Sequence, residues 1–257
     1  MVDRHLAPRL VAEALGTGLL LIAVVGSGIA AEQLSEDVGL QLLENAAATA
    51  AALIAIILAI GPVSGAHLNP VVTLADRLFG GLTNAEAAGY VAAQFVGGAV
   101  GVVIANLMFS LPAVELSTTS RSSGGLWLAE VVATFGLLLV IFGVVRSGRT
   151  SMAPFAVAAY IGGAYFFTSS TSFANPAVTT ARMLSDTFAG IAPGSAPAFV
   201  AAQLVGAALA VASVRLLYPD VTRAAGDVVL PHPRSSQRSG DGELPARTTE
   251  EVRPWKS

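Results

Sequence analysis

Long apolar runs, separated by short polar gaps, extend over the first 218 residues. Six of these runs are long enough to cross a bilayer, since a spanning helix needs about 17–25 apolar residues. Two shorter segments begin with Asn-Pro, which is typical of a helix start because asparagine caps a helix and proline fits its first turn. The pattern predicts an all-α membrane protein with spans near residues 9–31, 38–60, 87–109, 126–146, 152–171 and 197–218, and short helices near 69–79 and 175–185.

Three segments of the first half recur in the same order in the second half. AEALGTGLLL near residue 12 returns as AEVVATFGLLL near 129, LNPVVTLADRL near 68 as ANPAVTTARML near 174, and YVAAQFVGGAV near 90 as FVAAQLVGAAL near 199. Each copy holds three spans, so the second copy must enter the membrane from the opposite side. We therefore expect one domain, residues 1–218, built from inverted repeats at about 9–109 and 126–218, with two half-helices that re-enter from opposite faces.

Composition agrees with a membrane protein and excludes several function classes. Only 12% of the residues are charged, against about 25% in soluble domains. The chain has no cysteine and three scattered histidines, and no basic patch is interleaved with aromatic residues. We therefore expect no metal, no cofactor, no nucleic-acid partner and no enzyme activity. Residues 219–257 are polar and proline-rich, which predicts a disordered cytoplasmic tail.

Arginine placement predicts the orientation, because loops on the cytoplasmic side carry an excess of basic residues. With the N-terminus inside, most arginines of the first 218 residues lie in the cytoplasm, and only Arg121 and Arg182 lie outside. We expect a multi-pass protein of the cell membrane with both termini in the cytoplasm.

The two half-helices are the candidate site. Their N-termini, at Asn69 and Asn175, should meet near the bilayer centre, where free N–H groups and the helix dipoles create a positive potential that repels cations. Each asparagine side chain offers a hydrogen bond to a passing solute. The stretches before the half-helices should expose backbone carbonyls that are tolerated only beside a polar passage; these belong to Gly65, Ala66 and His67, and to Thr171, Ser172 and Phe173. This arrangement predicts a channel for small hydrogen-bonding solutes.

The motifs SGAHLNPVVT and SFANPAVTTAR, with residues 9–218 around them, resemble the aquaporin and glycerol-facilitator family, the major intrinsic proteins. The resemblance implies a right-handed bundle of six helices and two half-helices, a homotetramer embedded in lipid, and one pore per subunit for water and small neutral solutes. It also implies that the pore motifs are Asn69, Pro70 and Val71, and Asn175, Pro176 and Ala177.

The chain departs from the family pattern twice. Val71 stands where alanine is usual, which we interpret as a packing change, and Val178 stands where the family usually has an arginine that narrows the pore. The family's four constriction positions, carried over by their spacing from Asn69 and Asn175, fall at Thr49, Gly163, Ser172 and Val178. This set contains no aromatic residue and no arginine. We expect a wide opening for water, glycerol, urea or neutral metalloid acids such as arsenous acid. Bacterial relatives that lack this arginine are associated with metalloid permeation, and this resemblance favours arsenite among the candidate solutes.

Several polar residues have two interpretations. Glu13 and Glu130 occupy equivalent places in the repeats, and either accept hydrogen bonds from the loops before the half-helices or couple transport to protons in a secondary transporter. His67 either lines the pore or supports its loop. Arg182 is expected to reach the surface or to pair with Asp186, the alternative being a displaced positive charge in the outer vestibule.

Overall fold

The computed structural model describes residues 6–218 and leaves out residues 1–5 and the predicted tail, 219–257. Its regular elements are all helical, as expected from the sequence. They are α1 (Leu6–Leu34), α2 (Val38–Ser64), α3 (Pro70–Phe79), α4 (Asn84–Met108), α5 (Gly124–Arg146), α6 (Ala153–Phe167), α7 (Pro176–Ala181) and α8 (Ala196–Leu217), with 3₁₀ turns η1 (Thr150–Met152) and η2 (Arg182–Leu184).

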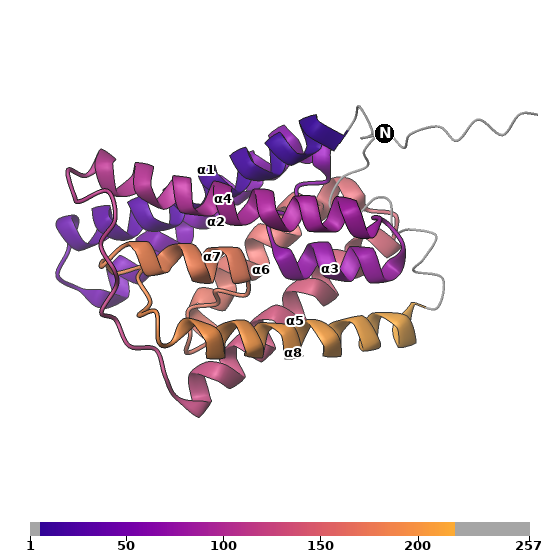
Figure 1. The fold of residues 1–257 in the computed structure, drawn as a ribbon. Coiled ribbons are helices and arrows are strands. Elements are labelled where there is room, and N and C mark those ends of the chain that lie inside the picture. The colour runs from indigo at the N-terminus through magenta and orange to yellow at the C-terminus, as the bar shows by residue number, and fades with distance from the viewer. Residues whose placement is uncertain (1–5, 219–257) are drawn as a thin grey trace, which may run out of the picture.

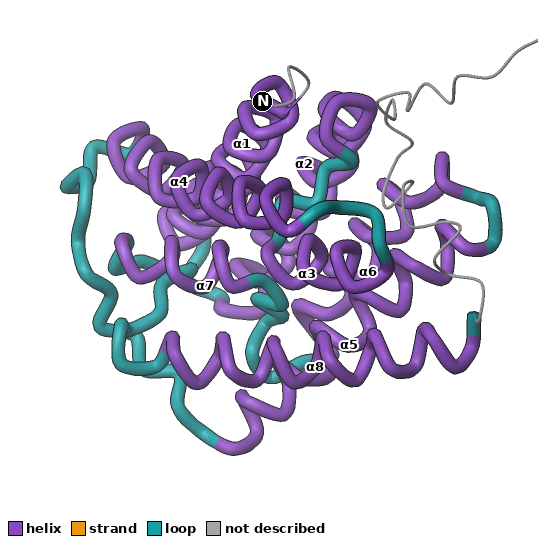
Figure 2. Tube along the Cα trace, turned by 45° about the vertical axis from the view of Figure 1, so that its right-hand side comes forward, coloured by secondary structure: helices purple, strands orange, loops and turns teal. Residues whose placement is uncertain are grey.

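The long helices enclose the two short ones. Helices α3 and α7 lie end to end in the middle of the bundle, with α1, α2 and α4 on one side and α5 and α8 on the other (Figures 1 and 2). The two repeats are interlocked, because α2 packs against α6, α3 contacts α8 and α7 contacts α4. The start of α1 and the end of α8 lie at the same end of the bundle (Figure 1).

Five of the six predicted spans have the length and hydropathy of membrane-crossing helices among the described residues: α1, α2, α4, α5 and α8. The predicted span 152–171 is shorter than expected. Helix α6 has 15 residues, which is about 22 Å, against a hydrocarbon core of about 30 Å. It ends at Phe167 because Thr168 turns into the extended chain that leads back to α7.

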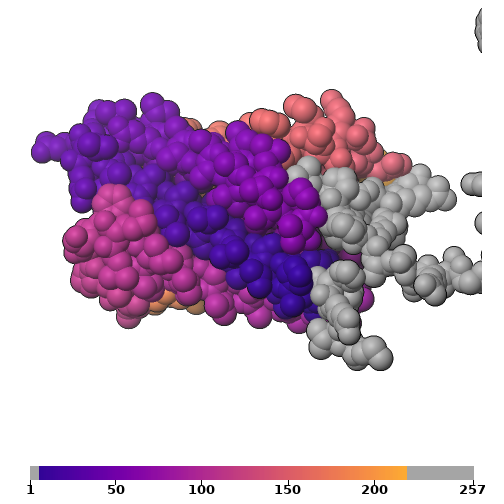
Figure 3. Space-filling view, turned by 90° about the horizontal axis from the view of Figure 1, so that it is seen from above, coloured from indigo at the N-terminus to yellow at the C-terminus, as the bar shows by residue number. Residues whose placement is uncertain are grey.

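The bundle exposes many apolar side chains on its outside and buries several polar and charged ones within its core. Leu15 and Leu19 of α1 are at least half exposed, whereas Glu13 on the same helix is completely buried. Seen from above, α1 and its neighbours in the first repeat form most of one elongated face (Figure 3). Lipid is the solvent that suits such an exterior, because apolar chains then lose nothing by remaining outside the bundle.

Matched glycines set the closest helix crossings. A Cβ atom at Gly97 of α4 would collide with the carbonyl oxygen of Ala14 in α1, and one at Gly206 of α8 would collide with that of Val131 in α5. Gly97 and Gly206 are equivalent positions in the repeats, so both crossings rely on a residue without a side chain.

We expect Gly97→Ala to destabilise the protein by about 1–3 kcal/mol, because helices α1 and α4 must move apart to admit the methyl group. Thermal unfolding in detergent measures this loss. The matched control is Gly163→Ala in α6, where the new Cβ would have no neighbour nearer than 3.6 Å. Equal stability of the two variants would contradict the packing role of Gly97.

Candidate pore site

The two Asn-Pro sequences start the half-helices in the same way. The Asn69 side-chain oxygen accepts from the backbone N–H of Val71 at 3.1 Å. The Asn175 oxygen accepts from Ala177 at 2.9 Å and Val178 at 3.2 Å. The following prolines occupy the first helical turn, where a missing N–H costs nothing.

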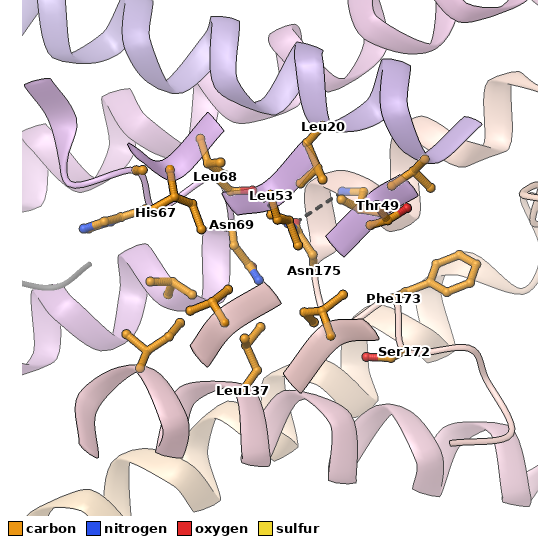
Figure 4. Close-up of a pocket in the computed structure, with 18 of the residues that line it drawn as sticks. Leu20, Thr49, Leu53, His67, Leu68, Asn69, Leu137, Ser172, Phe173 and Asn175 are labelled. Atoms are coloured by element: carbon orange, nitrogen blue, oxygen red, sulfur yellow. Dashed lines mark hydrogen bonds between the residues drawn. The ribbon is translucent and has the colours of Figure 1, made fainter. Parts of the chain in front are cut away.

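The asparagine amides cross-link the repeats. Asn69 Nδ2 donates to the carbonyl oxygen of Ala174, and Asn175 Nδ2 donates to that of Leu68, both at 2.8 Å (Figure 4 shows the second bond). Each amide nitrogen carries two hydrogens and gives one to this bond. Since both asparagines line the central cavity, the second hydrogen is available to a solute.

The loops before the half-helices have a strained and repeated backbone. Ala66 and Leu68 in the first loop, and Ser172 and Ala174 in the second, all have φ near +50°. Each non-glycine residue in this left-handed region costs on the order of 1–3 kcal/mol and persists only where its surroundings enforce it. Because the same positive φ angles recur at equivalent positions, the contacts around each loop must hold it in this conformation.

Glu13 is one of the groups that enforce this shape. Its carboxylate is completely buried in α1 and accepts hydrogen bonds from Ser64 Oγ at 2.6 Å, from the backbone N–H groups of His67 and Leu68 at 2.9 and 2.8 Å, and from Gln94 Nε2 at 2.7 Å. Four donors satisfy the charge, as a buried carboxylate requires.

Glu130 repeats the arrangement in the second half. It accepts from the backbone N–H groups of Phe173 and Ala174, both at 2.9 Å, and from Gln203 Nε2 at 2.6 Å. Gln203 also donates to Thr179 of α7, as Gln94 does to Thr73 of α3. Neither glutamate is among the residues that line the central cavity.

The central cavity passes the junction of the half-helices. His67 and Leu68 lie toward one end, and Thr49, Ser172 and Phe173 toward the other (Figure 4). One part of its wall is polar, made by the asparagines and the strained loops. The rest is apolar and consists of Leu20, Val24, Leu53, Ile57, Val72, Leu137, Ile141, Val157 and Ile161.

The structure corrects one constriction residue. Thr49, Ser172 and Val178 line the cavity, but Gly163 lies on the exposed face of α6 and does not. Tyr165 lines it instead, with its hydroxyl 3.3 Å from Thr49 Oγ1. Residues two positions apart on a helix point in directions about 200° apart around its axis. A spacing that is wrong by two residues therefore selects a side chain on the opposite face. The opening therefore contains an aromatic residue, contrary to the expectation from spacing.

The remaining predicted residues take different places. Val71 is fully buried and, like the backbone of Gly65 and Thr171, is not among the lining residues. His67 lines the cavity and is also held in its loop, with Nδ1 at 3.1 Å from Thr73 Oγ1 and Nε2 at 3.8 Å from Asp76. His67 therefore both lines the cavity and supports its loop, so the two interpretations hold together.

Arg182 is not where the sequence suggested. It is 3% exposed, lines the cavity and stacks over Phe173, with the guanidinium carbon 3.5 Å from the ring centroid. Its Nε donates to the carbonyl oxygen of Ala189. Asp186 accepts instead from the backbone N–H of Thr118 at 2.8 Å. The expectation of a surface arginine paired with Asp186 was wrong, because the loop after α7 folds back over the arginine.

Comparison with known proteins agrees with this geometry. The family model described as "Major intrinsic protein" matches residues 3–173 of the chain. The chain belongs to the major intrinsic protein family.

Relatives and structures extend the match over most of this major intrinsic protein. The chain is 49% identical over 217 residues to the aquaglyceroporin AqpS of Rhizobium meliloti, covering 84% of the chain and 93% of that protein. It is 29% identical over 232 residues to the probable aquaporin AqpM of Archaeoglobus fulgidus, covering 80% and 94%. The crystal structure of the aquaglyceroporin from Plasmodium falciparum superposes with a TM-score of 0.65 at 19% identity, covering 84% of this chain and 98% of that one, which shows the shared fold.

Membership establishes a multi-pass membrane protein of a channel family, not an enzyme. Sequence reasoning found both half-helices of this major intrinsic protein but missed Tyr165 and the apolar wall. The wall residues recur along α1, α2, α5 and α6 at helical spacing, and that spacing was the available signal.

We expect Glu13→Gln to destabilise the protein by about 2–3 kcal/mol, because an amide group would present N–H donors to an oxygen site that already faces donors. Thermal unfolding in detergent measures the effect. Glu44→Gln is the matched control, since that carboxylate lies half-buried in α2 and makes no hydrogen bond among the described residues. The transporter interpretation predicts a different result. The solute flux of the unmodified protein would depend on the proton gradient, and Glu13→Gln would abolish this dependence without lowering stability.

Proposed function

We propose that this protein is a passive channel for water and small neutral solutes such as glycerol. The observation that carries the proposal is the central cavity, which joins an apolar wall to a line of hydrogen-bonding groups past Asn69 and Asn175. A polyol presents carbon on one side and hydroxyls on the other, so both of its faces find suitable partners there. The close relative named an aquaglyceroporin supports the same solute class.

The half-helix junction supports selection against cations. The first turns of α3 and α7 meet at the cross-linked asparagines, so the positive ends of two helices converge on one place. A cation there would meet this field without its hydration shell, whereas a neutral solute receives hydrogen bonds. This is the selection that half-helix dipoles provide in pores.

The constriction in this proposal consists of Thr49, Tyr165, Ser172 and Val178. Ser172 Oγ is buried without a hydrogen-bond partner among the described residues, although Ser172 lines the cavity, so it is free to bind a solute there. Val178 leaves more room than an arginine. Glycerol, urea and arsenous acid are the candidate solutes, and each is small, uncharged and able to form several hydrogen bonds.

The alternative is a proton-coupled transporter that uses Glu13 and Glu130. Both carboxylates are completely buried, hold the loops in place and lie outside the cavity lining. These contacts favour the bracing role. We further propose a homotetramer in the cell membrane with both termini in the cytoplasm, which agrees with both ends of the described chain lying at one end of the bundle.

The protein reconstituted in liposomes should pass water and at least one larger neutral solute, measured by light scattering after osmotic shifts with glycerol or urea and by arsenite uptake. Val178→Arg should lower glycerol flux about tenfold, equivalent to about 1.4 kcal/mol of added barrier, and affect water less. Val178→Leu controls for size without charge. Passage of water alone through the unmodified protein would refute the wide-opening part of the proposal.

A further inference from the structure

An acidic and a basic residue stand at equivalent positions of the two repeats, Asp76 within α3 and Arg182 at the start of η2, directly after α7. Asp76 lies seven residues after Asn69, and Arg182 lies seven residues after Asn175. Both side chains are buried, with exposed fractions of 0% and 3%. The repeats match in their capping, bracing and threonine contacts, so this difference stands out as an asymmetry between the repeats, and of the two residues only Arg182 lines the cavity.

Arg182 is held in a way that leaves its outer nitrogens free. Phe173 covers the face of the guanidinium, and Nε donates to Ala189. The two Nη atoms, with four hydrogens, have no hydrogen-bond partner among residues 6–218, and the residue lines the cavity together with Val178 and Ser172. A buried guanidinium without partners for its Nη atoms is costly unless a solute or water in the cavity accepts from it.

No carboxylate neutralises Arg182 through a salt bridge among the described residues. Asp186 is engaged by Thr118, and Glu130 by the backbone and Gln203. A second cation, Arg121, approaches the same aromatic ring at 5.3 Å and donates to the carbonyl oxygens of Gly190 and Phe188. Burial lowers the pKa of Arg121 from its ordinary value, yet an arginine stays protonated at neutral pH.

We propose that Arg182 is a specificity-determining residue of the pore, which supplies the positive charge and the hydrogen-bond donors that Val178 does not provide. This inference rests on the proposed channel function and adds a residue to it. The charge acts in a narrow passage of low dielectric, where it repels cations more strongly than it would in water. The planar fork of Nη hydrogens binds the oxygen atoms of a neutral solute.

Arg182 lies at a different depth in the pore from an arginine at residue 178. Residue 182 lies one helical turn beyond residue 178, so the charge sits farther from the half-helix junction. Stacking on Phe173 holds the guanidinium against the wall. The pore thus keeps a cationic group while Val178 leaves room for solutes larger than water.

The test uses the full-length protein in liposomes, with glycerol and urea as neutral probes and with sodium and proton leak measured by a membrane potential and a pH dye. We expect Arg182→Gln to raise the cation or proton leak about tenfold and to change the ratio of glycerol to urea flux. Arg77→Gln is the matched control, since it removes an arginine at the far end of α3, where it bonds Asn84, and should leave both readouts unchanged.

Two further variants keep the test decisive. Adding Val178→Arg to Arg182→Gln should restore cation exclusion while reducing glycerol flux. Arg182→Lys keeps the charge without the planar fork, so it should preserve exclusion but alter the glycerol-to-urea ratio. If Arg182→Gln does not fold, the lysine variant decides, and an unaltered ratio there overturns the proposal.

Failure of this inference differs from failure of the channel function. An unmodified protein that passes no neutral solute refutes the channel itself. If the unmodified protein conducts glycerol, the channel function stands. An Arg182→Gln variant with the same cation leak and the same glycerol-to-urea flux ratio then overturns only the role of Arg182.

Discussion

The reciprocal pair of hydrogen bonds between Asn69 and Ala174, and between Asn175 and Leu68, is the constraint on which the rest of the structure depends. Two helix starts with unsatisfied N–H groups would repel one another and require water if they met in lipid. Each asparagine resolves this by capping its own helix with oxygen and holding the opposite loop with nitrogen. The strained loops, the buried glutamates and the glutamines all serve to keep these two starts in register.

The buried charges divide into two groups by what satisfies them. Glu13 accepts four hydrogen bonds and Glu130 three, mostly from the loops, and so both act as structural acceptors. Arg182 retains free donors and faces the cavity. All three groups are buried, so burial does not distinguish them. The groups that hold the pore in shape have their hydrogen bonds made within the protein, whereas the group that contacts solutes keeps donors free.

The sequence predicted the half-helices well because their signals are local. Asn-Pro marks a helix start, and α3 begins and ends within a residue of its expected bounds. Tyr165 was missed because its placement depends on where α6 ends, and the apolar run continues past that point into the loop. Arg182 was misplaced because its partners, Phe173 and Ala189, come from loops whose path no periodicity reveals.

The crossed asparagine bonds also impose an order on biogenesis. The partners are 105 and 107 residues apart in the chain, so the first half-helix is synthesised long before the loop that completes it. At about 5–20 residues per second, this delay is on the order of 5–20 s. Throughout it, the amino end of α3 lacks the two hydrogen bonds that residues 174 and 175 later complete. The last third of the chain therefore acts as the folding trigger for a segment made near its beginning.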